Sequence, residues 1–411
     1  FTTYLNGCSY GKWKKYTNLE KIKIQLDIEG TFKIFLVGYH LNIYSPVRKE
    51  FLTKEYCLEN RQLIEIDYPL NDEKILGFEI FTTDTCNIYG GSYIGEYDQT
   101  DVRNVTLSLA TTTCNKEAFI IPNMQILKKE IIESEDKEIR ENIYIHVVDN
   151  GRTLDPEAWN EKHLIIHPNK NTGGSGGFAR GMLEAMHQMP KATHVLLMDD
   201  DVIVLPESIR RTYMLLTLLK PQYQECFISG AMMYYEEMNM QHEDIGTVCF
   251  NSDFVSLKPK LFHDNLRDNL TNELDFLEHP NEYAGWWYCC IPVQQIEKNG
   301  LPLPLFIRCD DMEYSLRCNA KIITMNGICI WHMGFVNKYN AAFDRYQQCR
   351  NLLIGSAVFN SYQGVDFFEF WNNSFNAELM RFNYNAAELV LRALEDYMAG
   401  PSFLEQDRGE Q

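Results

Sequence analysis

The chain has 411 residues, a hydrophobic content of 45%, a charged content of 23% and a formal net charge of −19. The length predicts two or three domains, and the composition is typical of a soluble globular protein. The acidic balance argues against a nucleic-acid partner, which needs a basic surface. No apolar run approaches the ~20 residues that cross a bilayer. We therefore expect a cytoplasmic chain and leave open a peripheral contact with the inner face of the cell membrane.

The 12 cysteines are scattered along the chain and form no CxxC pair. Structural zinc sites usually need such pairs, so a zinc site is not expected. Cysteines without a framework spacing in a chain of this length are typical of reduced thiols in the cytosol.

Residues 1–100 predict an all-β module. Residues 22–28 alternate apolar and polar side chains, Glu29-Gly30 indicates a hairpin-like break, and residues 31–37 continue the alternation. Further short strands are expected at residues 63–66 and 75–81. Several short strands separated by Gly, Asn and Asp favour a β-sandwich or jelly-roll-like module.

Residues 101–340 predict a different architecture, in which strands alternate with helices. This alternation is typical of a Rossmann-like α/β domain with a mostly parallel sheet. The remaining residues, 341–411, are expected to be mainly helical. We expect strands at 105–109, 143–148, 164–166 and 194–198, and helices at 122–133, 178–188 and 206–219.

The strand at 194–198 runs directly into Asp199, Asp200 and Asp201. Open α/β sheets bind ligands at the carboxyl edge, where these carboxylates would lie. Adjacent like charges favour a neutralising partner, and Mg²⁺ or Mn²⁺ prefers oxygen ligands. An acidic turn without a ligand is the simpler alternative.

A glycine-rich segment, residues 171–177, precedes the helix expected from residue 178. Glycines allow backbone N–H groups to approach an anion, and a helix N-terminus favours negative charge. The segment matches neither a P-loop nor GxGxxG. A flexible connection between strand and helix remains the alternative.

A second acidic set comprises Asp310, Asp311 and Glu313, at the start of another expected helix. A carboxylate beside a bound sugar can act as a general base, whereas simple N-capping is the competing interpretation. His332 follows an apolar strand. Its position suits a metal ligand, and a structural histidine is the alternative. Trp286 and Trp287 point in different directions if they lie in a strand, so at least one is expected to line a cavity unless both pack in the core.

Taken in order, NTGGSGGFARGM, HVLLMDDDV, WW, FIRCDDMEY and WH resemble bacterial galactofuranosyltransferases of glycosyltransferase family two. The motifs cover about residues 105–355, and their combined order is far more specific than any one of them. The resemblance implies a GT-A catalytic domain at 101–340, an N-terminal β-sandwich at 1–100 and a C-terminal helical region at 341–411. It also implies inverting transfer from a UDP-sugar, most specifically UDP-galactofuranose, to a cell-envelope glycan or lipid-linked glycan.

The resemblance also implies a role for each matching residue. Mn²⁺ or Mg²⁺ would be held by Asp199, Asp201 and His332. Asp311 would be the general base, with Asp310 or Glu313 as the alternative, and Trp286 and Trp287 would bind the acceptor. The donor would be bound by Thr112, Asn115, Lys116, Asp149, Gly173, Gly174, Arg180 and Asp200.

Two residues depart from the family pattern. Lys116 stands where the family usually has Arg, which keeps the charge but loses bidentate geometry, and Cys309 stands where Trp is common. The alternatives are a pyranose donor on the same fold, a nucleotidyltransferase of GT-A type and a non-catalytic glycan-binding protein. Homo-oligomerisation is left open.

Overall fold

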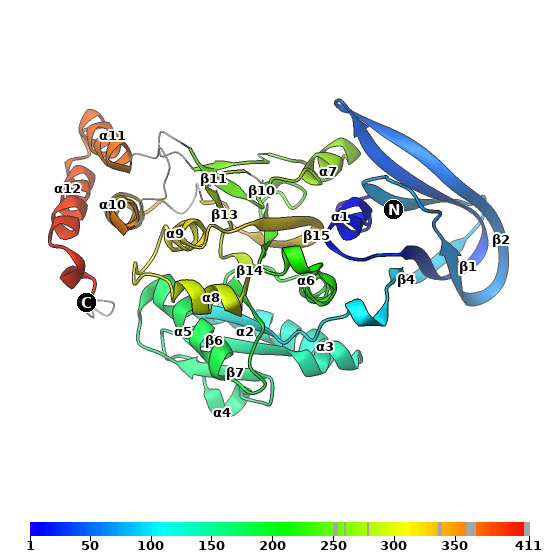
Figure 1. The fold of residues 1–411 in the computed structure, drawn as a ribbon, viewed down its shortest axis with the longest axis horizontal. Helices are drawn as coiled ribbons and strands as arrows, with labels where there is room; N and C mark the ends of the chain where they lie inside the picture. The colour runs from blue at the N-terminus through cyan, green and yellow to red at the C-terminus, as the bar shows by residue number, and fades with distance from the viewer. Residues whose placement is uncertain (250–253, 259, 278, 336–338, 359–366, 407–411) are drawn as a thin grey trace.

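The computed structural model describes residues 1–249, 254–258, 260–277, 279–335, 339–358 and 367–406. Figure 1 shows an N-terminal sheet of long strands at one end, a central α/β region, and C-terminal helices at the opposite end. Within the described ranges, no helix is both long and apolar enough to cross a membrane.

The N-terminal region forms one antiparallel sheet of four strands. Strand β1 pairs with β2 along its length, with β4 along its first half and with β3 along its second half. The predicted sandwich of two packed sheets is therefore not confirmed. The elements are α1 (Tyr10–Tyr16), β1 (Lys21–Asn42), β2 (Ser45–Asp67), β3 (Ile75–Phe81) and β4 (Cys86–Glu96).

The predicted hairpin break at Glu29-Gly30 is wrong, because β1 continues through it as a β-bulge between Ile28 and Gly30. Gly30 has a φ of +117°, and a Cβ there would lie 2.6 Å from the carbonyl oxygen of Thr85. Only glycine suits this backbone conformation, and a bulge bends the strand instead of ending it. The predicted alternation is confirmed, with Ile22 to Ile28 buried at every second position.

The central sheet confirms the predicted α/β class. Its order is β10-β9-β14-β8-β5-β6-β7, with β15 also paired to β9. Strands β5 to β8 are mutually parallel where they pair, whereas β14 is antiparallel to both β8 and β9. The strands are β5 (Leu107–Thr113), β6 (Ile143–Asp149), β7 (Leu164–Pro168), β8 (His194–Asp199), β9 (Phe227–Tyr234), β14 (Tyr288–Pro292) and β15 (Ile322–His332).

Two predicted helix starts are wrong. Helix α2 begins at Glu117, so Pro122 lies inside the helix and not in its first turn. An interior proline costs about 3 kcal/mol, and burial of Ile120 and Met124 against the sheet offsets that cost. Helix α5 begins at Gly173, before the predicted start at 178. The helices of this region are α2 (Glu117–Leu127), α3 (Lys137–Asn142), α4 (Pro156–Trp159), α5 (Gly173–His187), α6 (Pro206–Leu218), α8 (Val293–Asn299) and α9 (Asp310–Arg317).

The region predicted to be irregular, 235–285, contains short elements in its described part. Residues 250–253, 259 and 278 lie outside the described residues. The elements are β10 (Gln241–Glu243), β11 (Gly246–Val248), β12 (Phe254–Ser256), α7 (Leu266–Asn272) and β13 (Glu282–Tyr283).

The predicted helical character of the C-terminal region is confirmed where the structure describes it. A π-helical turn, η5 (Ala342–Gln347), leads into α10 (Gln348–Val358), which is followed by α11 (Phe367–Met380) and α12 (Tyr384–Met398). Their shared core contains Cys349, Leu353, Trp371 and Val390.

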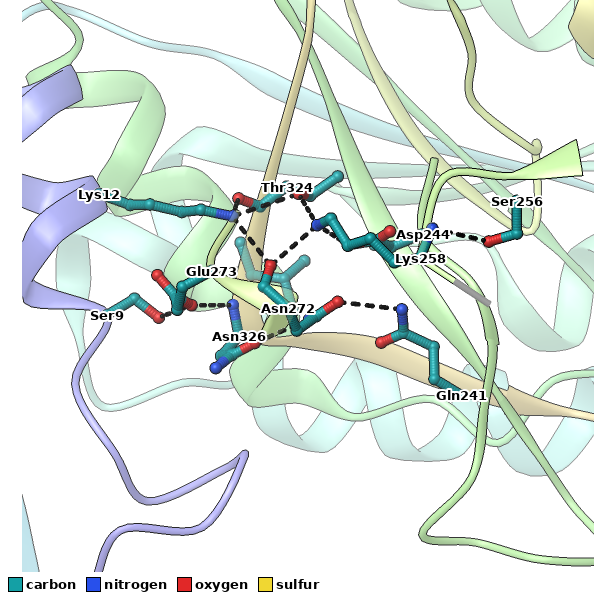
Figure 2. A network of polar contacts seen from close by, with 12 residues as sticks. Ser9, Lys12, Gln241, Asp244, Ser256, Lys258, Asn272, Glu273, Thr324 and Asn326 are labelled. Carbon is teal, nitrogen blue, oxygen red and sulfur yellow. Dashed lines mark hydrogen bonds and ion pairs between the residues drawn. The ribbon is translucent and has the colours of Figure 1, made fainter. Parts of the chain in front are cut away.

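A buried polar network joins the N-terminal region to the central sheet (Figure 2). The ammonium of Lys12 in α1 donates to the carbonyl oxygen of Thr324 in β15 at 2.6 Å. The ammonium of Lys258 donates to the Thr324 hydroxyl at 2.7 Å and to Asp244 Oδ2 at 2.6 Å. Both lysines are buried, and Lys12 links the N-terminal region to β15.

Candidate active site

A cavity of about 990 Å³ lies where the carboxyl ends of β5 and β8 meet the first turns of α5 and α9. Its wall also includes the end of β15 and two residues of the C-terminal region, Phe343 and Gln348. Ligands of open α/β sheets bind at this carboxyl edge. The cavity is therefore the candidate active site.

Asp199, Asp201 and His332 converge at this cavity. Each offers one ligand atom, and these atoms lie within 4.8 Å of one another. His332, which is 3% exposed at the end of β15, places its Nε2 3.1 Å from Asp201 Oδ1. Two carboxylate oxygens and an imidazole nitrogen are ligands that Mn²⁺ accepts. Mg²⁺ would bind mainly to the two carboxylate oxygens. The three residues fit a divalent cation.

The negative charge of this cluster has a cationic neighbour in Lys116. Its Nζ lies 3.2 Å from Asp200 Oδ1 and 3.1 Å from Asp201 Oδ2. Burial lowers the pKa of Lys116, but the charges of the two aspartates outweigh it and raise that pKa above its usual value. Burial also raises the pKa of Asp199 to about 6, although His332 opposes the shift. A bound cation would therefore stabilise the ionised form of these buried, closely spaced carboxylates.

Residues 173–177 of the glycine-rich segment form the start of α5, which lies at the cavity. Gly173 and Gly174 line the cavity, and Gly173 has a φ of +70°. A Cβ on Gly173 would lie 2.1 Å from the carbonyl oxygen of Phe306, and one on Gly177 would lie 2.0 Å from Thr112 Oγ1. These glycines allow α5 to lie against β5, which explains why the helix starts earlier than predicted.

Asp149 and Asn115 lie at the same edge of the sheet but are not among the residues that line the cavity. The Asp149 carboxylate accepts hydrogen bonds from the backbone N–H groups of Gly151, Thr153 and Leu154 at 3.0, 2.7 and 2.7 Å. Its role in this structure is to hold the loop that follows β6.

Two further predicted site residues also lie outside the cavity. Arg180 pairs with Glu184 at 2.5 Å along the outer part of α5. Glu313 is fully buried and pairs with Arg317 at 2.8 Å. Each charge has its partner within the same helix, and neither side chain lines the cavity.

Asp310 and Asp311 do line the cavity, from the first turn of α9. Asp311 Oδ1 accepts a hydrogen bond from the backbone N–H of Met312 at 2.7 Å. Burial and the charge of Asp311 raise the pKa of Asp310 to about 8, and burial also raises the pKa of Asp311. Two adjacent carboxylates of this kind tend to share one negative charge, which leaves one acid and one base.

Both tryptophans line the cavity and are largely buried. Trp287 Nε1 donates to the carbonyl oxygen of Gly230 at 3.1 Å, whereas Trp286 Nε1 has no hydrogen-bond partner among the described residues. Trp286 packs edge-on against Phe178 and Tyr314. The prediction that at least one tryptophan lines a cavity is confirmed.

Glu243 and Asn150 are among the lining residues that the sequence prediction missed. Glu243, in β10, is 5% exposed, accepts a hydrogen bond from the Tyr283 hydroxyl at 3.3 Å, and has its pKa raised to about 8 by burial and by the charge of Asp311. Asn150 donates to the carbonyl oxygen of Gly173 at 2.9 Å. Asn150 follows a strand end, a position that could have signalled it. Glu243 lies in three consecutive polar residues, which show no strand periodicity.

Comparisons with known proteins were made by sequence and by structure. No family model matches the chain. The galactofuranosyltransferase GlfT2 of Mycolicibacterium smegmatis is 26% identical over 98% of the chain, and GlfT2 of Mycobacterium tuberculosis is 24% identical over 98%. The chain resembles galactofuranosyltransferases over almost its full length. It covers 64% and 66% of those two proteins.

Similarity to solved structures is weaker. The mannosyltransferase PcManGT from Pyrobaculum calidifontis, in complex with GDP-Man and Mn²⁺, is 14% identical over 73% of this chain and 77% of that chain, with a TM-score of 0.40. Mannosyl-3-phosphoglycerate synthase from Rubrobacter xylanophilus is 11% identical over 64% of this chain and 76% of that chain, with a TM-score of 0.37.

Proposed function

We propose that the chain is an inverting, metal-dependent glycosyltransferase that moves a sugar from a UDP-sugar to a hydroxyl group of a glycan. The observation that carries the proposal is the convergence of Asp199, Asp201 and His332 on a cavity that Asp310 and Asp311 also line. A cation site and a carboxylate base on one cavity are what transfer from a nucleotide diphosphate requires.

The donor would bind at the sheet edge. Asp199, Asp201 and His332 would hold Mn²⁺ or Mg²⁺, which neutralises charge on the departing UDP when it is bound. The backbone N–H group of Gly174 would approach the diphosphate at the start of α5, whereas that of Gly173 donates to Asn171 Oδ1 at 3.1 Å. Lys116 supplies a further positive charge from the end of β5, next to the same carboxylates.

The acceptor would bind at the tryptophan side. The faces of Trp286 and Trp287 suit the apolar faces of sugar rings. Asp311 would take the proton from the acceptor hydroxyl while the oxygen of that hydroxyl forms a bond to the anomeric carbon. The bond from that carbon to the UDP oxygen breaks on the opposite face, and the configuration is inverted. Asp310, with its pKa raised to about 8, would stay largely protonated at neutral pH.

The identity of the sugar and the acceptor rests on sequence similarity. We propose UDP-galactofuranose as the donor and a cell-envelope glycan or lipid-linked glycan as the acceptor, because the two mycobacterial relatives are galactofuranosyltransferases. Peripheral membrane contact and homo-oligomerisation remain part of the proposal to be tested.

The test is release of UDP in the presence of Mn²⁺ and a galactan-like acceptor, with UDP-galactofuranose, UDP-galactopyranose and UDP-glucose as donors. Three variants, Asp311→Asn, Asp310→Asn and Glu313→Gln, are compared with the wild type. Loss of one general base costs about 10²–10⁴-fold in rate. We expect that loss for Asp311→Asn, whereas Glu313→Gln should keep turnover per folded molecule because Glu313 lies outside the cavity.

The outcomes separate the alternatives. Turnover of only a pyranose donor would retain the glycosyltransferase and reject the furanose donor. A larger loss in Asp310→Asn than in Asp311→Asn would move the base by one residue. Pyrophosphate release from UTP and a sugar phosphate would indicate a nucleotidyltransferase. Glycan binding without turnover of any donor would indicate a non-catalytic glycan-binding protein.

A further inference from the structure

A strained backbone segment precedes the two acidic residues of α9. Phe306, Arg308 and Cys309 have φ values of +71°, +72° and +64°. Each non-glycine residue in this left-handed region costs about 1–3 kcal/mol and persists only where its surroundings hold it in place. Cys309 is also the N-cap residue of α9 and provides no side-chain capping bond. The direction of the first turn of α9 therefore depends on what holds residues 305–309.

One side chain of the C-terminal region contacts most of this segment. Asn351, in α10, is 1% exposed. Its Nδ2 donates to the carbonyl oxygens of Leu305, Ile307 and Arg308 at 3.1, 2.9 and 2.9 Å. These are three of the four carbonyl groups between residues 305 and 308, and they meet at a single amide group.

The orientation of this amide is set by its neighbour. Arg350 donates through Nη2 to Asn351 Oδ1 and to the carbonyl oxygen of Leu305, both at 2.9 Å. Because the amide oxygen faces a guanidinium, the NH₂ group must face the strained segment. The Tyr346 hydroxyl, in turn, accepts from Arg350 at 3.2 Å and donates to Asp396 of α12 at 2.6 Å.

The fourth carbonyl group of the segment is held from the donor side. The carbonyl oxygen of Phe306 accepts a hydrogen bond from the backbone N–H of Ser175 in α5 at 3.1 Å. The segment is thus held between the glycine-rich start of α5 and Asn351 of α10. It continues directly into Asp310 and Asp311.

We propose that Asn351 is a positioning residue for the general base. By sharing its two N–H groups among three carbonyl groups of residues 305–308, it keeps the strained backbone in place, so that Asp311 faces the acceptor hydroxyl. It does not contact the substrates. The inference rests on the proposed function, and it makes the C-terminal helical region part of the catalytic machinery.

The test compares Asn351→Asp with the wild type. An ionised carboxylate keeps the size of the side chain but has no N–H to donate. The matched control is Asn71→Asp, at a buried asparagine of the N-terminal region whose Nδ2 donates to the carbonyl oxygen of Pro69 at 2.9 Å. A displacement of about 1 Å of a catalytic group can cost about 10²-fold. We therefore expect kcat to fall at least about tenfold in Asn351→Asp, whereas the control should retain it.

Two further measurements distinguish positioning from a general loss of stability. The KM for the donor and the affinity for UDP with Mn²⁺ should change less than about threefold, because the cation site is intact. Hydrogen exchange of residues 305–311 should become faster in Asn351→Asp but stay unchanged in the control. A kcat within about threefold of the wild type in a folded Asn351→Asp would overturn the proposal.

The hydrogen-exchange arm separates this proposal from the proposed function. If the wild type turns over no donor, the glycosyltransferase assignment fails, but unchanged exchange at 305–311 would still overturn the positioning role. If Asn351→Asp does not fold, the comparison is repeated with Asn351→Ala, which removes both N–H donors without placing a negative charge beside the carbonyl groups. A kcat of folded Asn351→Ala within about threefold of the wild type would then be the contrary result.

Discussion

Lys258 offers the sharpest test of the buried network by which Lys12 joins the N-terminal region to the central sheet. Its ammonium contacts Asp244 Oδ2, the Thr324 hydroxyl and the carbonyl oxygen of Asn272 at 2.6, 2.7 and 2.9 Å (Figure 2). Both charged side chains are at most 2% exposed. In Lys258→Met, Asp244 stays buried without its cation, and its Oδ1 already has no hydrogen-bond partner among the described residues.

Lys12 provides a matched comparison, because its ammonium contacts two of the same groups. In Lys12→Met, Lys258 still donates to the Thr324 hydroxyl and to the carbonyl oxygen of Asn272, so only the carbonyl oxygen of Thr324 loses its donor. Breaking a buried ion pair from one side costs about 3–5 kcal/mol. Loss of one charge-assisted hydrogen bond costs about 1.5–3 kcal/mol, and relief of repulsion between two ammonium groups reduces that figure.

Equilibrium unfolding in guanidinium chloride, followed by circular dichroism, measures both free energies. We expect a loss of about 3–5 kcal/mol for Lys258→Met and about 1–2 kcal/mol for Lys12→Met. The surface pair of Lys23 and Glu65, at 2.7 Å, is the control, and Lys23→Met should leave the free energy of unfolding close to that of the wild type. If Lys258→Met costs no more than Lys12→Met, the asymmetry inferred for the two lysines is refuted.

Three further predictions concern the site. His332→Ala should weaken Mn²⁺ binding by more than about tenfold in calorimetry, because a ligand is lost; unchanged affinity would remove His332 from the cation site. Gly177→Ala should cost about 1–3 kcal/mol through collision with Thr112, whereas Gly90→Ala has open space around it. The pKa of Glu243 is raised to about 8, so the stability from its protonated form is lost as pH rises toward 8. Glu243→Gln should flatten the fall in unfolding free energy between pH 5 and 8, and parallel curves would contradict this.

The central sheet was predictable because its strands are continuous apolar runs that alternate with helices. The carboxyl ends of such strands meet at one edge, which is why Asp199 and Thr112 could be expected to lie together before their pairing was seen. Helix starts were less predictable. The start of α5 depends on close approach to β5, which only glycines permit, and local propensity disfavours a helix in a run of glycines.

The N-terminal sheet shows why strand lengths were misjudged. Gly30 is locally a turn signal, but it lies within a continuous strand, where the pairing of β1 with β2 is irregular between Ile28 and Gly30. A turn and a bulge use the same residue type, and only the partner strands distinguish them. The single bent sheet follows from this one backbone choice, because β1 continues where a hairpin would have ended it.

The site residues also fall into two groups, those that the sequence predicts and those that it does not. Asp199, Asp201 and His332 belong to motifs that the sequence displays, whereas Glu243 depends on long-range contacts. Glu243 and Asp244 are consecutive, and successive side chains of an extended chain point to opposite sides. One lines the cavity beside Asp311, and the other pairs with Lys258 in the buried network. The pairing of Asp244 with Lys258 therefore also holds Glu243 against the cavity, so loss of the Lys258 ammonium should also displace Glu243 at the cavity wall.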